Sequence, residues 1–202
     1  MGKRAANFFS VIFHPIILPA LGMMILFNSG SVLDFIPFQA KKIILIIVFV
    51  CTAILPLTFI PFYVFQRIVR NVQMEQNRER LIPLLVTTLL YFLCYYLLVR
   101  LKVPETISLF VLAATHVVLI TFMITFKWKV SIHLAGIGGF VGALIAVAFR
   151  LQVNLEYFII AAILISGILG YSRLKLNKHK PYQIYVGWFV GFFIALATFY
   201  LF

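Results

Sequence analysis

Seven long apolar stretches alternate with short polar segments along the chain. Each is close to the roughly 20 residues that a helix needs to cross the hydrocarbon core of a bilayer. The stretches are continuously apolar and do not alternate residue by residue, which excludes a transmembrane β-barrel. The pattern predicts an all-α, polytopic transmembrane helix bundle with spans at about 8–27, 43–65, 82–99, 106–126, 131–149, 155–171 and 182–202. If the first stretch, which contains Pro15 and Pro19, inserts only halfway, the number of spans falls to six.

The composition excludes a soluble globular protein. Of the residues, 64% are hydrophobic and 11% are charged, whereas a soluble domain has about 25% charged residues. So few charges cannot cover a surface that faces water. Because the polar segments are short, we predict that residues 1–202 form a single integral membrane domain.

The chain is strongly basic, with a formal net charge of +12. In a membrane protein such an excess comes from cytoplasmic loops or from the binding of anionic ligands. Nucleic-acid binding is disfavoured, because the basic residues lie in short turns between spans. The expected partners are membrane lipids, and the sequence identifies no partner protein in a membrane complex.

The cations are distributed unequally between the two sides that the spans define. Side A, which holds the amino terminus, carries 12 of them: Lys3, Arg4, Arg67, Arg70, Arg78, Arg80, Lys127, Lys129, Arg173, Lys175, Lys178 and Lys180. Side B carries 5: Lys41, Lys42, Arg100, Lys102 and Arg150. The positive-inside rule therefore predicts a multi-pass protein of the cell membrane with side A in the cytoplasm.

Small residues recur four apart in two of the predicted spans. Gly138 and Gly142 follow His133, and Gly187 and Gly191 follow His179. Small residues at this spacing allow helix backbones to approach closely in lipid. If the fifth and seventh spans pack through these faces, the two histidines come together at side A. The alternative is that the glycines serve packing alone.

The last side-A loop contains the pattern S-R-x5-H-x3-Q-x3-G, from Ser172 and Arg173 through His179 and Gln183 to Gly187. This pattern resembles the third signature of the type 2 phosphatidic acid phosphatase superfamily, S-R-x5-H-x3-D. The segment Val130-Ser131-Ile132-His133 resembles the second signature, P-S-G-H, and residues 77–83 resemble the first, K-x6-R-P, only faintly. The resemblance covers roughly the last 125 residues and implies a phosphatase-like core over 66–202, preceded by two spans in 1–65.

The resemblance implies a phosphohistidine mechanism without metal or cofactor. His179 is then the nucleophile and His133 the general acid. Ser131 and Arg173, with Arg80 or Arg78, hold the phosphate of a lipid phosphate or diphosphate such as phosphatidate, phosphatidylglycerophosphate or a polyprenyl diphosphate. The residue types suit this chemistry independently, because two histidines can attack phosphorus and protonate the leaving oxygen. An arginine donates bidentately to phosphate oxygens.

Several positions depart from the family pattern. Gln183 replaces an aspartate that orients the nucleophilic ring, Ile132 replaces a glycine, and Gln73 replaces the lysine of the first signature. A glutamine oxygen can accept a hydrogen bond but supplies no negative charge. The alternative function is therefore a non-catalytic relative that binds or moves anionic lipid, or a subunit of a membrane complex.

Two further histidines lie within predicted spans. For His116 we favour a neutral imidazole bonded to a neighbouring hydroxyl or carbonyl over a functional role. His14, near side A, could join His133 and His179 in a metal or haem site. That alternative is disfavoured, because metal-ligating histidines usually have supporting carboxylates and side A offers only Glu75 and Glu79.

Overall fold

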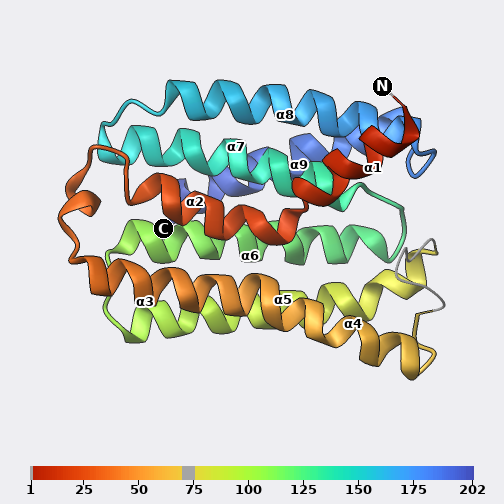
Figure 1. Ribbon diagram of the computed structural model, residues 1–202, viewed down its shortest axis with the longest axis horizontal. Coiled ribbons are helices and arrows are strands. Elements are labelled where there is room, and N and C mark those ends of the chain that lie inside the picture. The colour runs from red at the N-terminus through yellow and green to blue at the C-terminus, as the bar shows by residue number, and fades with distance from the viewer. Residues whose placement is uncertain (1, 70–75) are drawn as a thin grey trace.

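The computed structural model describes residues 2–69 and 76–202, and within these ranges every regular element is helical. The helices are α1 (Lys3–Ile12), η1 (Pro15–Ile17), α2 (Leu18–Leu26), η2 (Val32–Phe35), α3 (Phe38–Phe49), η3 (Val50–Ile54), α4 (Leu55–Phe65), α5 (Asn77–Arg100), α6 (Glu105–Thr125), α7 (Ile132–Leu151), α8 (Glu156–Lys175) and α9 (Pro181–Leu201). Seven helical units of the described chain are long and apolar enough to cross a membrane. The predicted all-α polytopic bundle is therefore confirmed (Figure 1).

The connections between the spans lie at the two ends of the bundle as the sequence predicts. The amino terminus, the end of α4, the start of α5, the α6–α7 connection and the α8–α9 connection lie at one end (Figure 1). This end is side A. The α2–α3, α5–α6 and α7–α8 connections lie at the opposite end, side B. All three segments that resemble the phosphatase signatures thus start from side A.

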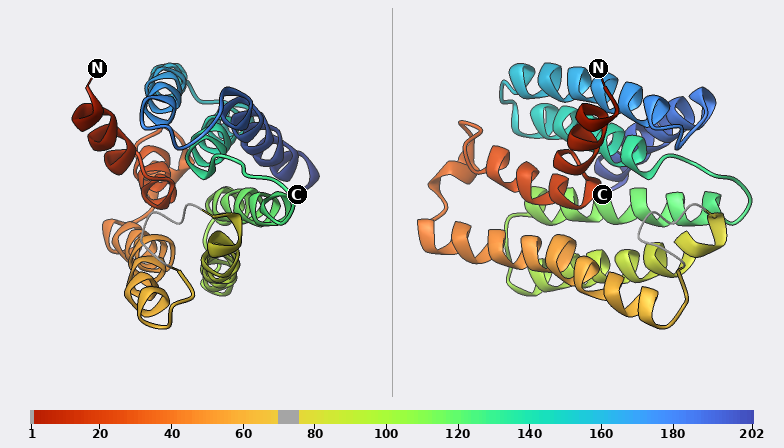
Figure 2. Two further views of the ribbon diagram at one scale, coloured as in Figure 1. Left: turned by 90° about the vertical axis from the view of Figure 1, so that its right-hand side faces the viewer. Right: turned by 45° about the vertical axis from the view of Figure 1, so that its right-hand side comes forward.

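The first span, Lys3–Leu26, is broken near its middle. Pro15 has no N–H and restricts the preceding residue, so α1 ends before it and η1 begins after it. α1 packs against α8, whereas α2 packs against α3, α6 and α7 (Figure 2). The break therefore turns α1 away from the line of α2, at the side-A end of the bundle.

Helix α7 is the centre of the bundle and packs most extensively against α9. Glycines make this close contact possible: a Cβ atom at Gly138 would collide with the Trp188 carbonyl, and one at Gly191 would collide with the Ala135 carbonyl. The predicted packing of the fifth and seventh spans through their small residues is confirmed. Because α7 and α9 touch along these faces, their side-A ends lie together.

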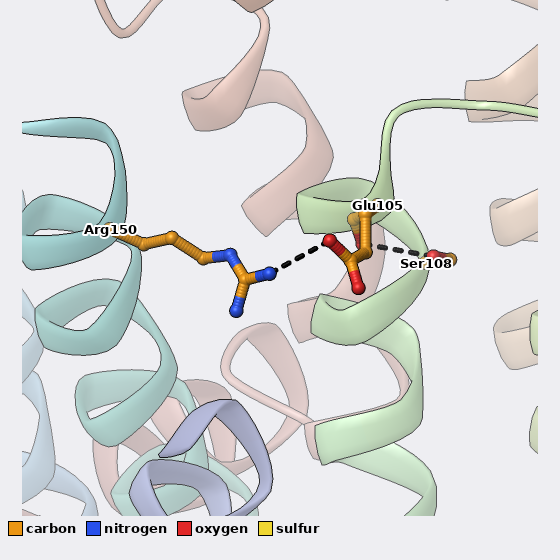
Figure 3. A network of polar contacts seen from close by, with 3 residues as sticks. All are labelled: Glu105, Ser108 and Arg150. Carbon is orange, nitrogen blue, oxygen red and sulfur yellow. Dashed lines mark hydrogen bonds and ion pairs between the residues drawn. The ribbon is translucent and has the colours of Figure 1, made fainter. Parts of the chain in front are cut away.

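At side B, an ion pair joins the start of α6 to the end of α7. Arg150 Nη2 donates to Glu105 Oε2 at 2.8 Å, and Ser108 Oγ donates to the Glu105 carbonyl oxygen at 2.9 Å (Figure 3). Both charged side chains are well exposed, so the pair contributes at most about 1 kcal/mol. It lies at the opposite end of the bundle from His133 and His179.

We expect Gly191→Ala to lower the thermal unfolding midpoint of the protein in detergent. The added methyl group meets the backbone of α7, which cannot move aside without separating the two helices. Overpacking of this kind costs about 1–3 kcal/mol. The matched control is Gly167→Ala in α8, where an added Cβ has no heavy atom within 4 Å. A Gly191→Ala protein that unfolds at the same temperature as the control contradicts the packing described here.

Candidate functional site

The predicted site residues come from separate elements that meet at the side-A end. His133 is the second residue of α7, His179 precedes α9, Arg173 lies in the last turn of α8, and Arg80 lies in the first turn of α5. His14 stands at the break of the first span. We call His14, Arg80, His133, Arg173 and His179 the side-A cluster.

His179 is buried and held by Gln183. Its Nδ1 lies 3.2 Å from Gln183 Oε1, which also accepts a hydrogen bond from the Lys180 N–H at 3.1 Å. Because Oε1 is an acceptor only, Nδ1 carries the hydrogen and Nε2 keeps its lone pair. Gln183 thus fixes the orientation and the tautomer of the His179 ring.

The electrostatic surroundings keep the His179 ring neutral. Burial, followed by the positive charges of Arg173, Arg80 and Lys129, lowers its pKa to about 3. The hydrogen bond to Gln183 opposes this shift. At neutral pH the ring is therefore an uncharged imidazole, which is the state that a nucleophile requires.

His133 is held from the amino-terminal helix. Its Nε2 lies 3.2 Å from the carbonyl oxygen of Ser10, so Nε2 donates and Nδ1 is the remaining ring nitrogen. The His14 ring packs edge to face against it, with ring centroids 4.9 Å apart. The sequence placed His14 near this end but did not predict that Ser10 and His14 contact His133.

The two arginines bring positive charge to the histidines. Arg173 lies within electrostatic range of His14, His133 and His179, and its Nε is buried with no hydrogen-bond partner in the described part of the chain. Arg80 is buried and acts on both Arg173 and His179. It also lies within range of the Glu79 carboxylate.

The remaining predicted phosphate ligands differ in their placement. Arg78 is exposed, whereas Arg80, two residues later, is buried, so Arg80 is the better candidate of the two. Ser131 is fully buried, and its N–H donates to the Gln183 carbonyl at 3.2 Å. Its Oγ has no hydrogen-bond partner among the described residues. Arg70, Gln73 and Glu75 lie outside the residues that the structure describes.

The sequence also raised a metal site that includes His14 and a hydrogen-bonded role for His116. Within residues 2–69 and 76–202, no group of three His, Cys, Asp or Glu side chains is arranged to hold a metal ion. His116 Nδ1 lies 3.0 Å from Thr198 Oγ1, whose own hydrogen goes to the Ile194 carbonyl. His116 is therefore a hydrogen-bonded histidine that links α6 to α9, with Thr198 as its partner and not the neighbouring Thr115.

We expect the His179 imidazole to remain neutral down to about pH 4, one unit above its pKa. Gln183→Asp places a carboxylate beside Nδ1, stabilises the imidazolium and raises that pKa. Nitrogen-15 NMR of histidine-labelled protein follows the protonation of the ring in both proteins, and Gln152→Asp at side B serves as the control. A His179 signal that titrates near pH 6.5 in the unchanged chain contradicts the electrostatics of the cluster.

No family model, curated protein or solved structure matches this chain. The proposed function therefore rests on the residues of the side-A cluster.

Proposed function

We propose that this protein is a membrane-embedded, metal-independent phosphatase of a lipid phosphate or diphosphate. The observation that carries the proposal is the state of His179: a buried neutral imidazole with Nδ1 bonded to Gln183. Its Nε2 lone pair is available, and Arg173 and Arg80 lie close by. This combination supplies a nucleophile together with cations for the oxygens of a phosphoryl group.

The proposed reaction has two steps. In the first, His179 Nε2 attacks phosphorus, the bond from phosphorus to the lipid oxygen breaks, and protonated His133 gives its proton to that oxygen. In the second, neutral His133 accepts a proton from water, whose oxygen attacks the phosphohistidine. The P–N bond breaks, inorganic phosphate leaves, and His179 is again neutral. Arg173 and Arg80 neutralise the phosphoryl oxygens in both steps.

The location of the cluster supports a lipid as the substrate. The cluster lies at the end of a bundle of seven apolar spans, so a hydrocarbon tail can remain in the bilayer while its anionic head reaches the cations. Phosphatidate, phosphatidylglycerophosphate and a polyprenyl diphosphate all have this form. The excess of Lys and Arg on side A supports a cytoplasmic site in the cell membrane. Labelling of single cysteines introduced within 176–180 with an impermeant reagent tests that face.

The second candidate function is the binding or movement of an anionic lipid without turnover, alone or in a membrane complex. The observation in its favour is Gln183, which orients His179 but cannot offer a negative charge to the imidazolium that forms when phosphate is transferred. Both candidates use the same cationic cluster and differ only in the chemistry of His179.

The test is phosphate release by the purified protein in mixed micelles that contain each of the three lipid classes. We expect release from at least one class, together with a phosphoenzyme that is stable in alkali and labile in acid, as a phosphoramidate is. Binding of the same lipids without release or phosphoenzyme overturns the phosphatase and supports the second candidate. Absence of both binding and release overturns both functions.

A further inference from the structure

The break in the first span frees a backbone carbonyl at the candidate site. In a continuous helix the Ser10 carbonyl would accept the N–H of residue 14. Here the His14 N–H donates instead to the Val11 carbonyl at 3.3 Å, because α1 ends before Pro15. The Ser10 carbonyl is left over and accepts His133 Nε2–H at 3.2 Å. The helix break therefore creates the acceptor that holds the second histidine of the site.

The same break fixes the ring of His14 beside His133. His14 is the residue before η1, and its Nδ1 accepts the Ile16 N–H at 3.4 Å. The ring then meets the His133 ring edge to face, at an interplanar angle of 80° and a centroid distance of 4.9 Å. This is a favourable geometry for two aromatic rings. His133 is thus held at Nε2 by a carbonyl and on its ring by an imidazole, both from one short segment.

We propose that His14 is a positioning residue for the general acid His133 and that the segment Ser10–His14 completes the site. This inference rests on the proposed phosphatase function. With Nε2 committed to the Ser10 carbonyl, Nδ1 of His133 is the atom that delivers the proton to the leaving oxygen. The carbonyl accepts Nε2–H in the neutral ring and in the cation alike, so the ring keeps its orientation while Nδ1 gains and loses its proton. The contact of His14 acts through the packing of its ring, not through its nitrogens.

Substrates with different leaving groups distinguish a positioning role of His14 from a purely structural one. An alkoxide leaving group needs a proton from the general acid, whereas a nitrophenolate leaves without one. Loss of His133 positioning therefore slows hydrolysis of a lipid phosphate and spares hydrolysis of 4-nitrophenyl phosphate. General acid catalysis contributes about 10²–10⁴-fold, so we expect His14→Ala to lower turnover of phosphatidate about 10²-fold and to change the aryl ester less than about threefold. Both rates are measured in mixed micelles.

Two further variants complete the experiment. His14→Phe keeps a ring in the same place and is expected to retain most of the lipid phosphatase activity. Phe8→Ala removes an exposed ring from α1, the helix that carries Ser10, and is expected to behave like the unchanged chain. Size-exclusion chromatography and thermal unfolding establish that each variant is folded.

The outcomes separate this inference from the proposed function. Equal losses on both esters in His14→Ala, or a loss in His14→Phe as large as in His14→Ala, overturn the positioning role while the phosphatase stands. If the unchanged chain hydrolyses neither ester, the phosphatase and the positioning role both fall. The inference is supported if His14→Ala loses activity on the lipid ester alone and His14→Phe retains that activity.

Discussion

Replacement of His179 by alanine is expected to lower the rate of phosphate release by about 10⁴-fold or more, because loss of a nucleophile that forms a covalent intermediate removes the whole pathway. The neighbouring groups are expected not to substitute for it. Nε2 of His133 is bonded to the Ser10 carbonyl, and its Nδ1 is the proposed proton donor to the leaving oxygen. The arginines have no lone pair to offer. The measurement is the initial rate of phosphate release from the best lipid substrate, together with the yield of phosphoenzyme after acid-free quenching.

The control for this variant is His116→Ala, which removes an imidazole from α6 where it contacts Thr198 of α9. This control is expected to keep phosphate release and phosphoenzyme formation while losing some thermal stability. A His179→Ala protein that retains a tenth of the original rate, or that still forms the phosphoenzyme, shows that another residue attacks phosphorus. The proposed mechanism is then wrong even if the protein is a phosphatase.

The number and order of the spans were predictable because hydrophobicity is a local property of the sequence. The ends of the spans were predicted less well, since charged side chains near a helix end do not reveal their partners. The second span begins at Phe38 and not near residue 43, because Lys41 Nζ donates to the Phe27 and Asp34 carbonyls at 3.0 and 2.9 Å. The third span begins at Asn77, and its first turns bury Glu79 and Arg80.

The candidate site was predictable only where its residues follow a linear pattern. The spacing from Arg173 through His179 to Gln183 is local, and the glycines of α7 and α9 predicted that His133 approaches the same place. The choice between Arg78 and Arg80 needed the structure, because residues two apart on a helix point in nearly opposite directions. The Ser10 carbonyl carries no sequence signal of its own. Only the dipeptide His14-Pro15 indicates that a helix ends there and leaves an acceptor free.

Replacement of Arg173 is expected to have the second largest effect on catalysis. Arg173 acts on all three histidines of the side-A cluster, and its buried Nε has no hydrogen-bond partner in the described part of the chain. In the proposed mechanism this guanidinium donates to the oxygens of the phosphoryl group. Loss of one preorganised donor to a transition-state oxygen costs about 10²–10³-fold in turnover. We expect Arg173→Ala to lower kcat/KM for the lipid substrate by this amount.

Arg173→Lys is expected to recover only a small part of the loss, because an ammonium is a point charge without the planar fork that binds two phosphate oxygens. The matched control is Lys175→Ala, which removes an exposed cation from the last turn of the same helix α8. This control tests whether the loss in Arg173→Ala comes from weaker long-range attraction of anionic lipid, which 0.5 M salt would screen. Steady-state kinetics at low and high salt distinguish long-range attraction from a direct contact with the phosphoryl group. If Lys175→Ala lowers kcat/KM as much as Arg173→Ala does, and salt abolishes both effects, then side A attracts lipid by its overall charge. If only Arg173→Ala lowers kcat/KM, and salt does not change the effect, then this guanidinium acts on the transferred phosphoryl group.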